Sequence, residues 1–183
     1  MIFDNVKKAV FIGSHTDDEM VAAGTLRKLV KNGVKVDVLA FSCAPIPGKS
    51  QEETEKILGR EFAKATKSIG ASFKNLPPMD FDPRTLLKDE DEIRQILYDY
   101  TVKEKPDVAF VLSPEDEHQS HALVGKSAER VMKNRVPLVL RCHYPWNFIN
   151  PGRRNFFVKL TQDEFEAKMA VIRAYKSQHF RYD

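Results

Sequence analysis

Short apolar runs alternate along this chain with longer segments in which apolar residues recur every three or four positions. The runs have the length and β-branched content of buried strands, and they lie at residues 10–14, 34–42, 71–76, 108–112 and 136–142. The periodic segments have the spacing of amphipathic helices, and they lie at residues 20–32, 50–69, 86–104, 122–134 and 161–177. We also expect a short edge strand at residues 156–160. Capping-box patterns at the starts of two helices support these boundaries, with Ser50 before Glu53 and Thr161 before Glu164.

The regular alternation of strands and helices predicts an α/β fold. Parallel strands need crossover connections, so the sheet should be mainly parallel, with helices on both faces. With the strands in the order 3-2-1-4-5, the first and fourth strands are neighbours and their connections leave in opposite directions. A crevice then opens at the carboxyl ends of these two strands. The length and the lack of any linker composition predict one domain over residues 1–183.

A dense group of polar residues follows the first predicted strand. His15, Asp17, Asp18 and Glu19 fall within five positions, in the sequence HTDDE. Imidazole and carboxylate are ligands that Zn²⁺ accepts. The three acids would equally suit a helix N-terminus, where carboxylates meet free amides and the positive end of the helix dipole. His15 favours chemistry over capping, because a cap does not need it.

A second polar group follows the fourth predicted strand, in the loop expected at residues 113–121. This loop holds Asp116, His118 and His121, and the two histidines are three positions apart at the entry to a helix. That spacing lets both imidazoles face one crevice. Three of the five histidines thus fall on two loops that the predicted topology places together, which favours a metal site. Asp116 is equally compatible with a part in that site and with capping the following turn.

The two groups together resemble the motifs of the PIG-L/LmbE-like deacetylase family. HTDDE is similar to the family's H-P-D-D-E, and the later pair of histidines is similar to its D-x-H-x-D-H or H-P-D-H. The segments LRKLVKNGVKVDVLAFS and AYKSQ resemble its first helix with second strand and its closing helix. The resemblance implies a Rossmann-like three-layer sandwich and a zinc-dependent removal of acetyl from N-acetylglucosamine-type conjugates.

The resemblance also implies a role for each motif residue. His15, Asp18 and His121 match the metal ligands, Asp17 matches the general base, and His118 matches the histidine that stabilises the oxyanion and protonates the departing amine. Two neutral imidazoles and one carboxylate suit Zn²⁺ with an open position for water, and another divalent ion such as Fe²⁺ would also be accepted. The spacing of the residues leaves open which of the two aspartates binds metal.

Three positions depart from the family pattern. Thr16 stands where the family has proline, and Ser120 stands where it has a second aspartate that would orient a neighbouring histidine. The family's arginine three positions before the glutamate of the second helix is replaced by Leu58, while Arg60 is adjacent to Glu61. We therefore keep two alternatives: an amidase of a larger sugar conjugate, and a catalytically idle protein that binds metal or sugar.

Residues after the fifth predicted strand could contact a substrate at the same end of the sheet. An indole can stack on a sugar face, and cationic groups can meet a phosphate or carboxylate. The candidates are His143, Trp146, Arg153 and Arg154. The opposing interpretation is a loop packed by its own aromatic side chains. Glu19 is expected to be a helix-start residue or a structural partner, and not a catalytic residue.

Bulk properties exclude several classes of protein. The net charge is +3, and no run of lysine and arginine reaches five residues, so we expect no nucleic-acid partner. The family resemblance implies a small-molecule amino-sugar conjugate as the partner. The first turn lacks the G-x-G-x-x-G of a dinucleotide site. No apolar run approaches the length of a membrane span. Cys43 and Cys142 lie far apart, which predicts buried free thiols in a reducing cytoplasm.

Overall fold

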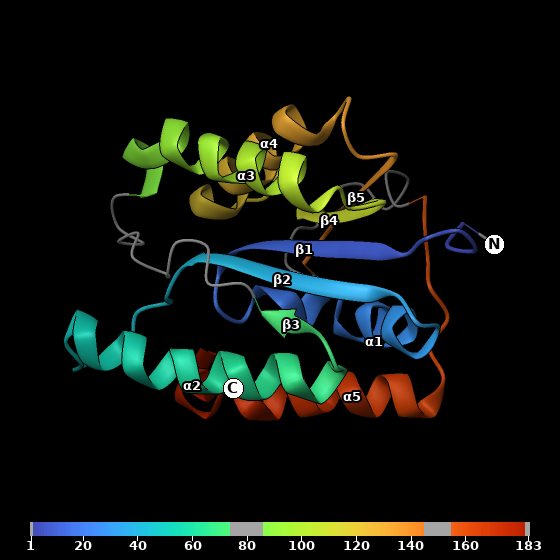
Figure 1. Cartoon of the computed structure of the whole chain (residues 1–183). Helices are drawn as coiled ribbons and strands as arrows, with labels where there is room; N and C mark the ends of the chain where they lie inside the picture. Colours follow the sequence, from blue (N-terminus) through green and yellow to red (C-terminus); the bar gives the residue numbers. More distant parts are fainter. Residues whose placement is uncertain (1, 74–85, 145–154, 182–183) are drawn as a thin grey trace.

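A computed structural model of the chain describes residues 2–73, 86–144 and 155–181 (Figure 1). Five strands form one sheet in the order β3-β2-β1-β4-β5, and every neighbouring pair is parallel. The strands are β1 Lys8–His15, β2 Lys35–Ser42, β3 Ser72–Phe73, β4 Val108–Leu112 and β5 Leu138–Cys142. The predicted α/β class with a parallel sheet is confirmed.

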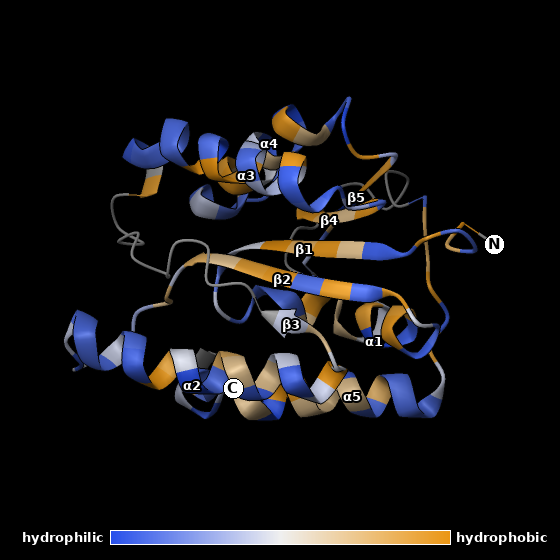
Figure 2. Cartoon of the chain, in the orientation of Figure 1, coloured by the Kyte–Doolittle hydropathy of each residue, from blue (hydrophilic) through white to orange (hydrophobic). Residues whose placement is uncertain are grey.

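Helices cover both faces of this sheet, as Figure 1 shows. The α-helices are α1 Ala23–Lys31, α2 Gln51–Ile69, α3 Glu90–Glu104, α4 Gln119–Met132 and α5 Gln162–Ala174. The 3-10 helices within the described residues are η1 Asp18–Val21, η2 Leu86–Asp89 and η4 Lys176–Arg181. One apolar core lies between the sheet and α1, α2 and α5, and a second lies between the sheet and α3 and α4. The strands between these layers are largely apolar, whereas the outer helix faces are hydrophilic (Figure 2).

Local sequence signals account for several element boundaries. Both predicted capping boxes form, because the side chains of Ser50 and Thr161 accept from the backbone at Glu53 and Glu164 while those glutamates accept in return. Gly70 ends α2 with a φ of 75°, a conformation that glycine adopts without steric cost.

The central strand β1 places the two polar groups of the sequence side by side. β1 pairs with β4 from Ala9 opposite Val108 to Ile12 opposite Val111, so both strands end at the same edge of the sheet. His15 closes β1, and the chain beyond Leu112 begins at the adjacent strand end. The predicted crevice between the first and fourth strands is therefore built into the strand order.

Some predicted boundaries are wrong. β1 extends to His15, and α4 already begins at Gln119. His15 and His121 therefore lie on a strand and a helix and not on loops. Of the third strand only Ser72–Phe73 forms within the described chain, and residues 74–76 lie outside it.

The prediction of an edge strand at residues 156–160 is also wrong, because this segment has no regular secondary structure and no strand partner among the described residues. Side-chain packing holds it instead. A Cβ on Gly24 would meet Cδ1 of Leu160 at 2.4 Å, which shows how closely the segment crosses α1. The rings of Phe3 and Phe156 pack edge to face with their centroids 5.8 Å apart.

Both cysteines are free thiols. Cys43 is buried and Cys142 is partly buried, and burial raises the pKa of each thiol to about 12. Within the described residues, none of the helices has the length and apolar composition needed to cross a membrane.

We predict that Gly125→Ala destabilises the fold through the contact between α4 and β4. A Cβ at Gly125 would lie 2.2 Å from the carbonyl oxygen of Leu112, and neither backbone can move away without disturbing the packing. We expect a loss of about 1–3 kcal/mol in the free energy of unfolding, measured by urea denaturation. Lys126→Ala, at an exposed position of the same helix, is the control and should stay near the wild-type value.

Candidate metal centre

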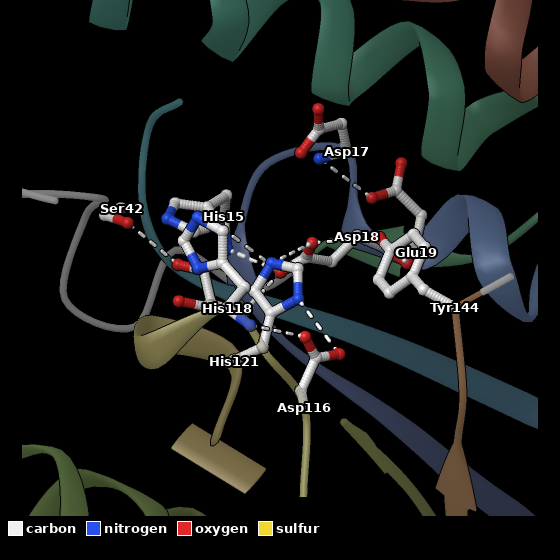
Figure 3. A network of polar contacts seen from close by, with 10 residues as sticks. His15, Asp17, Asp18, Glu19, Ser42, Asp116, His118, His121 and Tyr144 are labelled. Atoms are coloured by element: carbon white, nitrogen blue, oxygen red, sulfur yellow. Dashed lines mark hydrogen bonds and ion pairs between the residues drawn. The ribbon is translucent and has the colours of Figure 1, made fainter. Parts of the chain in front are cut away.

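Three side chains from separate elements converge at the carboxyl edge of the sheet. His15 ends β1, Asp18 begins η1, and His121 lies in the first turn of α4. One ligand atom from each lies within 4.8 Å of the others, and all three residues are buried. Figure 3 shows the two imidazoles and the carboxylate pointing toward one another.

The carboxylate of Asp18 is fixed by backbone and side-chain donors. Its Oδ2 accepts the N–H groups of Ser14 and His15, at 2.7 and 2.8 Å. Its Oδ1 accepts the hydroxyl of Tyr144 at 2.9 Å. Burial and the nearby carboxylate hold the pKa of Tyr144 well above its usual value, so this hydroxyl remains a donor. The close approach of the Asp18 side chain to β1 needs glycine at position 13, where a Cβ would lie 2.9 Å from the Cβ of Asp18.

His121 lies between two carboxylates. Its Nε2 is 3.1 Å from Oδ1 of Asp18, and its Nδ1 is 3.4 Å from Oδ2 of Asp116. Asp116 also caps the turn, because its Oδ1 accepts the backbone N–H of His118 at 2.9 Å. Asp116 thus contacts a histidine of the group and also caps the turn that follows it. It supplies a carboxylate at His121 even though Ser120 replaces the family's second aspartate.

The charged groups around Asp18 and His121 shift the pKa values of these two residues in opposite directions. Burial alone would raise the pKa of Asp18, but the charges of His121 and His15 and the bond from His121 bring it well below its usual range. Burial alone would lower the pKa of His121, but the carboxylates of Asp18 and Asp116 raise it to about 10. A metal ion binding to this imidazole would therefore have to displace a proton.

The donor set fits a divalent metal. In a tetrahedral Zn²⁺ site, two ligand atoms that each lie about 2.0–2.1 Å from the ion are about 3.3 Å from one another. Oδ1 of Asp18 and Nε2 of His121 are separated by a similar distance, 3.1 Å. The carboxylate of Asp116 near the other nitrogen of His121 matches the outer partner that metal-binding histidines usually have. This arrangement can hold one cation with a position left for water.

His118 lies at the exposed side of the group. Its ring stacks on His121 with the centroids 4.4 Å apart and meets the ring of His15 edge to face at 5.1 Å. His118 occupies the N-cap position of α4, but its side chain makes no capping hydrogen bond. It is exposed, whereas His15 and His121 are buried. His118 is therefore accessible to a molecule that approaches the candidate metal centre.

Asp17 lies beside the group on the loop between β1 and η1 (Figure 3). Its side chain is buried, and its backbone φ of 128° is unusual for a residue with a side chain. Its N–H donates to Oε2 of Glu19 at 3.2 Å. Glu19 is itself buried, which raises the pKa of its carboxyl to about 8, and it accepts the hydroxyl of Tyr175.

Of the four remaining sequence candidates, the structure describes one, His143. His143 is partly buried and lines a cavity of about 520 Å³ with Val21, Leu140 and Phe156. The other three, Trp146, Arg153 and Arg154, lie outside the described residues. Substrate contacts of all four stay a prediction.

Sequence reasoning missed two tyrosines that the structure brings to the site. Tyr144 bonds to Asp18 and Tyr175 bonds to Glu19, across 126 and 156 positions of the chain. The position of Tyr144 just after β5 is the one local signal that could have indicated the first contact. Nothing in the local pattern around Tyr175 indicates the second.

Comparison with known proteins gives a family. The model of the PIG-L family, described as GlcNAc-PI de-N-acetylase, matches residues 10–132 and so includes all of His15, Asp18 and His121. No protein with a curated description matches the chain.

Solved structures with the same fold come from proteins of low sequence identity. An N,N'-diacetylchitobiose deacetylase from Pyrococcus horikoshii, complexed with an inhibitor, is 22% identical, with a TM-score of 0.74 over 96% of this chain and 72% of that one. A teicoplanin deacetylase in its zinc-inhibited form is 14% identical, with a TM-score of 0.70 over 93% and 84%. A 4-carboxy-2-hydroxymuconate hydratase from Pseudomonas putida KT2440 is 19% identical, with a TM-score of 0.63 over 95% and 80%. At these identities the likeness concerns the fold alone.

We predict that the protein binds about one divalent ion per chain through this group. His15→Ala and His121→Ala should each abolish tight binding, because each removes one of three protein ligands. Elemental analysis after dialysis against a metal buffer measures the content. His179→Ala, which removes an exposed histidine of η4, is the control and should keep the full content. Full metal content in a His15→Ala/His121→Ala double variant would show that the ion binds elsewhere.

Proposed function

This chain belongs to the PIG-L family, and we propose that it is a metal-dependent hydrolase that removes acetyl from an N-acetylglucosamine-type amino sugar or glycoconjugate. The observation that carries the proposal is the buried group of His15, Asp18 and His121, with the exposed His118 stacked beside it. The matching family model is described as a de-N-acetylase, which supports an amide-cleaving reaction.

We assign the metal to His15, Asp18 and His121, with Zn²⁺ first and Fe²⁺ as the next choice. When bound there, a divalent cation lowers the pKa of a water molecule and polarises the amide carbonyl of the substrate. Tyr144 and the backbone N–H groups of Ser14 and His15 hold the carboxylate of Asp18 in place for this purpose.

We assign the proton transfers to Asp17 and His118. Asp17 accepts a proton as the water oxygen attacks the acetyl carbon. His118 donates to the oxyanion that develops on the carbonyl and then gives its proton to the nitrogen as the C–N bond breaks. The products are acetate and a free amino sugar. The exposure of His118 and its stacking on His121 support this role, because a substrate can reach the imidazole.

Two other functions remain distinct from this proposal. An amidase of a larger sugar conjugate would release a longer acid and no acetate. A protein that only binds metal or sugar would release neither. The hydratase among the structural neighbours shows that this fold also occurs in a protein with a different reaction. Measurement of acetate released from a panel of N-acetylglucosamine conjugates separates these cases.

The metal must be varied in this assay, because one neighbouring deacetylase is known in a zinc-inhibited form. The protein should be stripped with a chelator and reloaded separately with Zn²⁺, Fe²⁺, Mn²⁺ and Co²⁺. Acetate release with at least one metal is expected. Its absence with every metal and conjugate, from protein that binds metal, would contradict the proposed reaction.

We predict that Asp17→Asn keeps the metal but lowers kcat by about 10²–10⁴-fold, the usual contribution of a general base. Asp99→Asn, at an exposed position of α3, is the matched control and should leave kcat unchanged. If Asp17→Asn loses the metal while Asp18→Asn retains it, the roles of the two aspartates are exchanged.

We predict that His118→Ala keeps the metal and lowers kcat by about 10²–10³-fold, as for the loss of one oxyanion donor. The wild-type rate should also fall at high pH, as the donor loses its proton, and this decline should disappear in the variant. The measurement is kcat against pH on an active conjugate, with His179→Ala as control. An unchanged rate in His118→Ala would leave this residue as a bystander.

A further inference from the structure

Asp17 has a backbone conformation that needs support from its surroundings. Its φ of 128° and ψ of −15° fall in a region that residues with a side chain rarely adopt. The other non-glycine residue with positive φ in the described chain is Lys105, whose left-handed conformation at the end of α3 is common at helix ends. A strained residue keeps such a conformation when neighbouring groups hold it there.

Glu19 holds the amide of Asp17. Its Oε2 accepts the N–H of Asp17 at 3.2 Å, and its Oε1 accepts the hydroxyl of Tyr175 at 2.5 Å. Glu19 is 1% exposed. A buried carboxyl group without hydrogen-bond partners is unfavourable, so these contacts decide where its two oxygens stand.

Tyr175 is fixed in turn by the end of the chain. It follows α5 directly, is completely buried, and its carbonyl accepts the N–H of Gln178 at 3.0 Å. Ser177 bonds to Glu61 of α2 twice, from its N–H at 3.0 Å and from its Oγ at 2.6 Å. The tyrosine hydroxyl is therefore aimed at Glu19 by a turn that is tied to a different helix.

We propose that Tyr175 and Glu19 are positioning residues that hold the strained loop of Asp17 and so aim its carboxylate. The proposal rests on the proposed function, in which Asp17 accepts the proton from water. Satisfying a buried carboxyl group would not by itself require that one of its oxygens accept from the one strongly strained amide in the described chain. This contact distinguishes a positioning role from simple packing.

The first experiment needs no activity. Amide hydrogen exchange, followed by NMR on the full chain, is compared between wild type, Tyr175→Phe and Tyr98→Phe. Exchange at the Asp17 amide should become at least about tenfold faster in Tyr175→Phe, because the loss of its donor frees Glu19. The amides of Ser14 and His15, which donate to Asp18, should change less than about twofold.

Tyr98→Phe is the matched control, since this exposed tyrosine packs on Arg135 on the outside of α3. It should leave exchange at Asp17 unchanged. Unchanged exchange at Asp17 in Tyr175→Phe would overturn the proposal. If Tyr175→Phe does not fold, Glu19→Ala replaces it, because it removes the oxygen that accepts the Asp17 N–H, and the same result is expected.

The second experiment is a kinetic cycle on an active conjugate with metal-loaded protein. Tyr175→Phe should lower kcat by about tenfold to a hundredfold with KM and metal content unchanged. The double variant Asp17→Asn/Tyr175→Phe should be no slower than Asp17→Asn, because the tyrosine acts through the aspartate. Equal losses in both backgrounds would overturn the positioning role.

A negative result rejects a different hypothesis in each experiment. If wild type releases no acetate, the proposed function fails and the exchange measurement alone decides whether Tyr175 holds the loop. If wild type is active but exchange at Asp17 does not respond to Tyr175→Phe, the positioning role fails and the proposed function stands.

Discussion

The carboxylate of Asp18 is the contact on which the rest of the site depends. It accepts two backbone N–H groups at the end of β1, accepts the hydroxyl that follows β5, and faces the imidazole at the start of α4. A buried charge is unfavourable unless it is paired and hydrogen-bonded, and here the contacts come from the end of β1, from the residue just beyond β5 and from the start of α4. The same carboxylate therefore joins three segments of the chain and presents an oxygen to the candidate metal.

Close backbone approaches allow this arrangement to form inside a packed fold. Gly13 leaves room for the side chain of Asp18, and Gly125 lets α4 lie directly against the end of β4. α4 then carries His121 and His118 to the carboxyl edge of the sheet, where β1 delivers His15. The strand order places β1 and β4 together, which is the arrangement that forms crevices in open α/β sheets.

The family and the fold constrain the chemistry to different degrees. Membership of the PIG-L family and the convergence of two imidazoles with a carboxylate support metal-assisted amide hydrolysis. The fold alone does not, because a hydratase shares it. In the proposed reaction the proton transfers fall to Asp17 and His118, which lie next to the candidate metal centre and differ in burial.

The sequence by itself determined the α/β class, the five main strands, both capping boxes and the proximity of HTDDE to the later histidines, His118 and His121. These features follow from local periodicity and from the geometry of parallel strands, which short stretches of sequence encode. Only the tertiary structure decided that α4 begins early enough to include His121, and that residues 156–160 form no strand with any described part of the chain. It also brought Tyr144 to Asp18 and Tyr175 to Glu19, and it set the strained backbone of Asp17. These contacts join residues more than a hundred positions apart, and a local pattern cannot specify which distant group will satisfy a buried oxygen.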